Sequence, residues 1–72
     1  MYVEPPPHMK RRALEQVREA GRNGLLVEIG WESRTQMCLV QDGLLWQSVA
    51  RGRKYKFELT PEGAKLLAAA ER

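Results

Sequence analysis

The sequence predicts a small α+β domain in which three helices pack on a two- to three-stranded antiparallel hairpin. Three observations support this fold class. Helical periodicity follows a proline-rich start, an alternating strand pattern lies near the C-terminus, and a Thr-Pro-Glu helix start comes directly after that strand. A chain of 72 residues has room for one domain with a single small core.

The chain begins with an extended arm, residues 1–7, and we expect the domain itself over residues 8–72. Three consecutive prolines favour polyproline II, and only Pro7 can enter a helix, as its first residue. Over residues 9–22 apolar side chains recur at helical spacing, with charged residues between them. Glycine and Asn-Gly signals then end this first helix.

The next segment, LLVEIGWES, fits either a short helix or a short strand. Further on, YKFELT alternates apolar and charged residues, which predicts a strand with one buried face. LLWQSVA is its expected partner, and the basic RGRK loop connects the two strands. Thr60 is then a good N-cap and Pro61 a good first residue for the last helix.

The stretch CLVQDGLLWQ permits two interpretations. Its Asp-Gly pair is a strong hairpin signal, but that hairpin would carry apolar residues on both faces, and few helices remain to cover them. A helix over 33–41 needs fewer assumptions, since Ser33 can cap it and Gly43 can take the left-handed position after it. Leu44 would then fold back on Leu39. We therefore favour the helix.

Composition limits the functions that the chain can have. The net charge of +3 gives only a modest attraction for phosphate. The one cysteine, Cys38, excludes an intrachain disulfide and a thiolate metal cluster, and we expect it to be buried. His8 should lie at the surface. Since no catalytic constellation, metal site or cofactor motif is visible, we expect a protein that is not an enzyme.

Localisation can be read only from what the sequence does not contain. No apolar run approaches the length of a membrane-spanning helix. The N-terminal MYVEPPPHM has an acid and prolines where a signal peptide would have basic residues and an apolar stretch. We therefore expect a cytoplasmic protein that does not bind membranes.

Three pieces of the sequence match a known pattern. SRTQMCLVQDGLL is similar to the second helix of a helix-turn-helix, LLWQSVARGRKYKFELT is similar to a wing, and FELTPEGAKLL is similar to a closing pattern of aromatic strand, Leu-Thr, acid, Gly and Leu-Leu. Together they resemble the winged helix-turn-helix family over roughly residues 9–70. Many bacterial and phage transcription regulators share this arrangement, and so do winged helices that bind only protein.

The resemblance implies a small module that binds double-stranded DNA in transcriptional regulation. The helix over 33–41 would lie in the major groove, and the wing over 51–54 would contact the DNA backbone. The implied nucleic-acid-binding residues are Arg34, Thr35, Gln36 and Gln41 of the helix, Arg51, Arg53 and Lys54 of the wing, and Arg11 and Arg12 in the basic cluster of the first helix. Arginine would read guanine and glutamine would read adenine.

An alternative from a different class is a winged-helix adaptor or dimerisation module that does not bind DNA. MCLV places four apolar residues in a row, so a helix there cannot bury all of them. A surface formed by Met37, Cys38 and Trp31 could then dock on a protein partner or on a second copy of the chain. We expect Trp31 and Trp46 to be core or subunit-contact residues.

Overall fold

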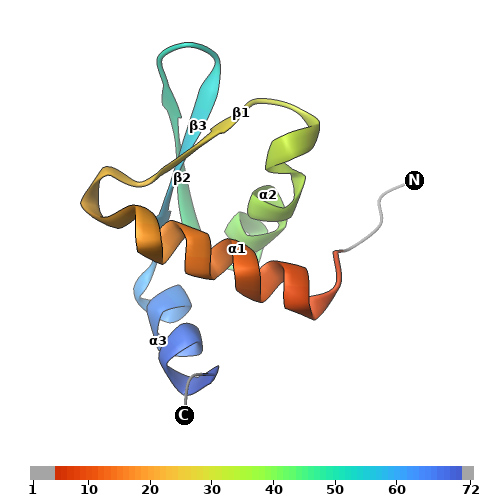
Figure 1. Cartoon of the computed structure of the whole chain (residues 1–72), viewed down its shortest axis with the longest axis vertical. Helices are drawn as coiled ribbons and strands as arrows, with labels where there is room; N and C mark the ends of the chain where they lie inside the picture. The colour runs from red at the N-terminus through yellow and green to blue at the C-terminus, as the bar shows by residue number, and fades with distance from the viewer. Residues whose placement is uncertain (1–4, 71–72) are drawn as a thin grey trace.

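Three α-helices and a three-stranded antiparallel sheet make up residues 5–70, the part of the chain that the computed structural model describes (Figure 1). The predicted α+β fold class is confirmed. In chain order the elements are α1 (Pro7–Ala20), η1 (Gly21–Asn23), β1 (Leu25–Glu28), η2 (Trp31–Ser33), α2 (Arg34–Gln41), β2 (Leu45–Ala50), β3 (Lys54–Leu59) and α3 (Pro61–Ala70), where η denotes a 3-10 turn.

The sheet has the strand order β1-β3-β2, so β3 is the central strand. Phe57 of β3 pairs with Leu25 of β1 on one side and with Gln47 of β2 on the other. Phe57 is buried, as the alternation in YKFELT predicts. The opposite face of the sheet is open, and Leu26 and Trp46 are exposed there. Trp46 is therefore not a core residue.

One hydrophobic core joins all three helices to the sheet. Each residue of this core is apolar and faces inward from its helix or strand. The core residues are Ala13, Leu14 and Val17 of α1, Leu39 of α2, Leu45 of β2, Phe57 of β3 and Leu67 of α3. Burial of their apolar surface is the main force that holds the elements together.

The first helix differs from the prediction at both ends. It begins at Pro7, which takes the predicted N1 position. Pro7 was expected to be the last residue of the arm, so the helix starts one residue earlier than the expected domain. It ends at Ala20, before the expected residue 22. The Gly21 N–H donates to the Arg18 carbonyl oxygen, so the helix tightens there into the 3-10 turn η1. Residues 1–4 of the predicted arm lie outside the described residues.

The segment LLVEIGWES forms a strand and then a 3-10 turn. In β1 the half-buried Leu25 and Val27 alternate with exposed neighbours, and the strand pairs with β3. The prediction that the Ser33 side chain caps α2 is wrong. Ser33 Oγ donates instead to the Gly30 carbonyl oxygen at 2.9 Å, which closes the turn η2.

The C-terminal end of α2 is a Schellman motif, so the helical interpretation of residues 33–41 is confirmed and the hairpin is wrong. The Gly43 N–H donates to the Val40 carbonyl oxygen at 3.0 Å, and the Leu44 N–H donates to the Leu39 carbonyl oxygen at 2.9 Å. Gly43 has a φ of 79°, a left-handed conformation in which a side chain would be strained.

The end of α2 is tied directly to the start of α3 by four residues, Gly43, Leu44, Thr60 and Gly63, which we call the α2–α3 junction. The Thr60 hydroxyl donates to the Gly43 carbonyl oxygen at 2.7 Å and accepts from the Gly63 N–H at 3.1 Å. The Thr60 N–H donates to the Leu44 carbonyl oxygen at 3.2 Å. Thr60 is therefore the predicted N-cap and also the link between the two helices.

Gly63→Ala should destabilise the protein, although alanine is the better helix former. A Cβ at Gly63 would overlap the Leu44 carbonyl oxygen and lie 3.2 Å from Leu59 Cδ2. We expect a loss of about 1–3 kcal/mol in the free energy of unfolding, measured by urea denaturation. The control is Ala64→Gly at an exposed position of α3, which should cost only about 1 kcal/mol. A stabilising effect of Gly63→Ala would contradict this close approach.

Candidate nucleic-acid interface

Three of the four residues 51–54, in the turn between β2 and β3 and at the start of β3, are positively charged. Arg51 and Arg53 lie in the turn and are exposed, while Lys54 begins β3 and is half-buried. All three belong to the predicted wing. Guanidinium and ammonium groups held on an exposed turn are suited to contact phosphate without regard to base sequence. We call these three residues the basic turn.

Arg53 adopts a backbone conformation that normally requires glycine. Its φ is 59°, the only positive φ of a non-glycine residue in the described part of the chain. This conformation costs an L-residue roughly 1–2 kcal/mol. The Arg53 carbonyl oxygen accepts a hydrogen bond from the Ile29 N–H at 3.0 Å, which fixes the turn against the end of β1. A glycine would adopt the same conformation without strain, so the cationic side chain is retained at a cost in stability.

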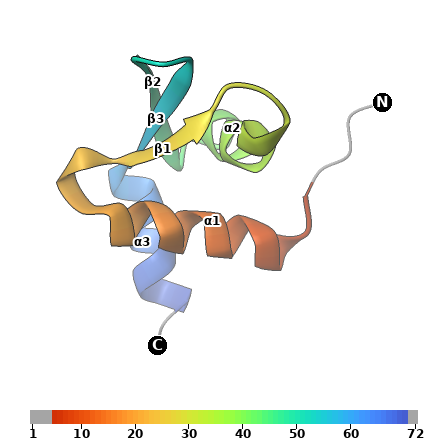
Figure 2. The same cartoon turned by 45° about the horizontal axis from the view of Figure 1, so that its top comes forward.

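The basic turn lies on the same side of the molecule as the segment that leads into α2. Glu28 at the end of β1 pairs with Lys54, and the chain then passes through η2 into α2. Figures 1 and 2 both place the β2–β3 turn and this segment on the side away from α3. Glu28 and Glu32, both exposed, add negative charge to this side.

One stripe of α2 faces outward beside Trp31. Arg34, Met37 and Gln41 are spaced by three and four residues and, with Trp31, line a hollow of about 270 Å³. The Arg34 guanidinium carbon lies 4.0 Å from the centroid of the Trp31 ring, a cation–π contact that orients the arginine. Trp31 is 75% exposed, so the core alternative of our expectation is wrong for it, and the subunit-contact alternative stays a prediction. We call Arg34, Met37, Gln41 and Trp31 the α2 stripe.

Two predicted groove-facing residues lie on a different side of α2. Thr35 and Gln36 line a separate hollow of about 210 Å³ together with Arg12 of α1. Gln36 is only 7% exposed, and its Oε1 has no hydrogen-bond partner among residues 5–70. In this conformation little of its side chain is exposed to a base edge, and the adenine contact by Gln36 stays a prediction. Gln36 lies three residues before the fully buried Leu39 and therefore shares its inward face of α2.

The basic cluster of α1 is divided between two surfaces. Arg11 Nη2 donates to the carbonyl oxygen of Ala70 in α3 at 3.4 Å, and Lys10 forms an ion pair with Asp42, also at 3.4 Å. Arg12 instead borders the hollow beside Thr35. The structure therefore brings the basic turn and Arg34 to one side and leaves Arg11 near the C-terminal end of α3.

The segment between α1 and α2 differs from that of a helix-turn-helix. In that motif two helices flank a short turn. Here the 3-10 turn Trp31–Ser33 comes directly before α2, and β1 separates α2 from α1. The candidate recognition element is thus a single helix of eight residues.

Trp31 is the residue of this surface whose exposure sequence reasoning left open, since we expected either a core or a subunit-contact residue. The signal that could have found it is the Gly30-Trp31 pair, because a tryptophan that follows a glycine in a turn has no helix or strand periodicity to bury it. Cys38 is buried and His8 is exposed, as predicted.

Neither a metal site nor a membrane span is found in the part of the chain that the structure describes. Across residues 5–70, His, Cys, Asp and Glu do not gather in a group of three or more that could bind a metal ion. None of the helices over the same residues has the length and apolar character needed to cross a bilayer.

The chain was compared with models of known protein families, with curated proteins and with solved structures, and none of them matches.

Gln36→Met should leave the fold intact and raise or preserve its stability. The substitution replaces a buried acceptor without a partner by an apolar side chain of similar length. Because an unsatisfied buried polar group costs about 1–3 kcal/mol, we expect the free energy of unfolding to rise by up to about 1 kcal/mol. Thermal unfolding followed by circular dichroism measures this. A large loss of stability would show that the Gln36 amide has a partner in the folded protein.

Proposed function

We propose that this chain is a small winged-helix module of the cytoplasm that binds double-stranded DNA and acts in transcriptional regulation. The observation that carries the proposal is the strained Arg53 in the basic turn, beside the α2 stripe. A residue held in an unfavourable backbone conformation on an exposed turn is typical of a functional site. The sequence resemblance to winged helices supports the same function.

In this mechanism the basic turn supplies most of the affinity. Arg51, Arg53 and Lys54 contact phosphates along the backbone and release bound counterions. Arg34 and Gln41 of the α2 stripe reach base edges in the major groove, where arginine pairs with guanine and glutamine with adenine. Trp31 holds the Arg34 guanidinium in place, which lowers the entropy lost on binding. Gln36 has no part in this set, because it is buried.

The number of cations limits the strength of binding. Glu28 and Glu32 oppose phosphate on the same side of the molecule. With about three phosphate contacts, a monomer should bind DNA weakly and with a shallow salt dependence, a slope of about −3 in log K against log salt. Tight and selective binding would then require two copies on one site.

A second candidate function is docking of a protein partner, or of a second copy, on the α2 stripe. The observation that favours it is the exposure of Trp31 beside the half-buried Met37 in a hollow of about 270 Å³. Tryptophan and methionine are enriched at protein interfaces. A self-associating chain would show a dimer in sedimentation velocity that Trp31→Ala abolishes. If wild type and Trp31→Ala sediment as the same monomer at every concentration, self-association through this stripe is excluded.

Arg53→Gly should weaken DNA binding without weakening the fold. The change removes one cation and relieves the strained backbone, so the free energy of unfolding should stay constant or rise by about 1 kcal/mol. The affinity for a random duplex should fall about 3- to 10-fold, and the salt slope should fall by about one. Fluorescence anisotropy at about 50 mM and about 200 mM salt measures both.

The matched control for Arg53→Gly is Arg22→Gln, which removes one exposed positive charge from η1, outside the basic turn. We expect this variant to retain the wild-type affinity and salt slope. Equal losses for the two variants would mean that only net charge matters and that the basic turn is not a site. If the wild-type protein does not bind duplex DNA at about 50 mM salt, the proposed function is wrong.

A further inference from the structure

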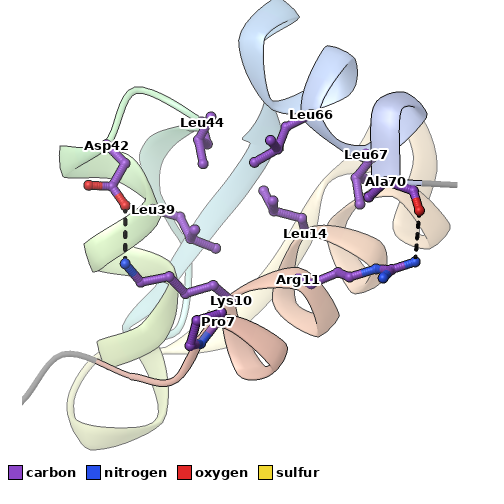
Figure 3. Close-up of a pocket in the computed structure, with 10 residues that line it drawn as sticks. All are labelled: Pro7, Lys10, Arg11, Leu14, Leu39, Asp42, Leu44, Leu66, Leu67 and Ala70. Atoms are coloured by element: carbon purple, nitrogen blue, oxygen red, sulfur yellow. Dashed lines mark hydrogen bonds and ion pairs between the residues drawn. The ribbon is translucent and has the colours of Figure 1, made fainter. Parts of the chain in front are cut away.

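An apolar hollow opens where the three helices meet (Figure 3). One of these helices, α3, lies at the end of the molecule opposite the β2–β3 turn (Figure 1). The hollow has a volume of about 360 Å³, within the range of small-molecule sites. Its innermost residues are Leu14 of α1, Leu39 of α2 and Leu67 of α3, which also belong to the core. The hollow therefore reaches the interior of the domain.

The sides of the hollow are also apolar. Leu44, just after α2, and Leu66 of α3 point toward the same space in Figure 3. Leu66 is 49% exposed, although it lies next to buried leucines. The hydrogen bonds of Thr60 join the two helices at the point where α2 ends and α3 starts. Farther from that point, side chains from α2 and α3 face each other across the hollow.

Charged groups are confined to the mouth of the hollow. Lys10 is already paired with the carboxylate of Asp42 at 3.4 Å. The Arg11 guanidinium contacts a neutral group, the Ala70 carbonyl oxygen, at 3.4 Å. Among the described residues that line the hollow, two are cations and one is an anion, so one positive charge is in excess at the mouth. A carboxylate could bind the arginine fork through two hydrogen bonds, which are stronger than one long contact to a carbonyl.

We propose that this hollow binds a small amphipathic carboxylate, an acid with a flexible or flat apolar body. The apolar body occupies the space between the leucines, and the carboxylate binds the Arg11 guanidinium at the mouth. The Lys10–Asp42 pair forms the other side of the mouth and disfavours a second negative charge. An apolar pocket with a few polar groups at one end is the usual design of such sites. This site is independent of the proposed DNA surface.

The experiment uses octanoate as the probe and 1-octanol as a neutral probe with the same number of carbon atoms. Both are titrated into the full chain with labelled leucine methyl groups, below the concentration at which octanoate forms micelles. We expect saturable NMR shifts at Leu14, Leu39 and Leu67 with both probes. Arg11→Gln should weaken octanoate binding about 5-fold or more and change octanol binding less than about 2-fold.

Two further variants make the result specific. Arg12→Gln removes the neighbouring exposed charge, which does not line the hollow, and should leave octanoate binding unchanged. Leu66→Trp places a larger side chain at the mouth and should reduce the affinity for both probes, while circular dichroism reports that the protein is still folded. This variant tests the location of the site, and the arginine variants test the preference for an acid.

Three results would overturn the proposal. Shifts that do not saturate, or that are spread over the surface, would show that the probes bind without a site. Equal effects of Arg11→Gln on octanoate and octanol would show that the hollow does not select a carboxylate. Broadening of the same leucine methyls with protein concentration alone, together with a dimer in sedimentation, would assign the hollow to a second copy of the chain.

Discussion

The contact between Thr60 and the turn after α2 is the constraint on which the rest of the structure depends. The Thr60 hydroxyl caps α3 and also donates to the Gly43 carbonyl oxygen. The backbone N–H of Thr60 donates to the Leu44 carbonyl oxygen. These bonds satisfy polar groups at two helix ends that would otherwise be left without partners. They also explain why a glycine is needed at position 63, where the Leu44 carbonyl oxygen approaches the backbone of α3.

This junction sets the geometry of both candidate sites. Because the end of α2 is fixed, the short helix presents Arg34 and Gln41 on one outward stripe while Cys38 and Leu39 enter the core. The strand β2 starts immediately after the junction and leads into the basic turn, so that turn is positioned by the same contact. On the other side, residues of α1, α2 and α3 line the apolar hollow, and Leu44 of the junction is one of its lining residues.

Most elements of the fold could be predicted from local sequence signals, because those signals are short-range. The cap at Thr60 and the left-handed Gly43 act over a few residues, and the structure confirms both. The strand β1 could not be assigned, since LLVE becomes a strand only by pairing with β3 far along the chain. The Ser33 side chain was expected to cap α2, but it donates to the Gly30 carbonyl oxygen of the preceding turn.

The candidate sites were less predictable for a related reason. The position of a side chain on a helix of eight residues depends on which neighbours enter the core. Four apolar residues in a row leave that choice open, and the outcome buries Gln36 and exposes the stripe beside Trp31. The hollow near Arg11 needs contacts between α1 and α3, so no local pattern could have indicated it.

The most direct test of this account is native-state amide hydrogen exchange at Leu44, Thr60 and Gly63. If the junction holds the fold together, these three amides should exchange only when the whole domain unfolds, with the same opening free energy as the slowest amides of β3. If they exchange as fast as amides of an exposed turn while β3 stays protected, the junction opens on its own, and the geometry derived from it does not hold.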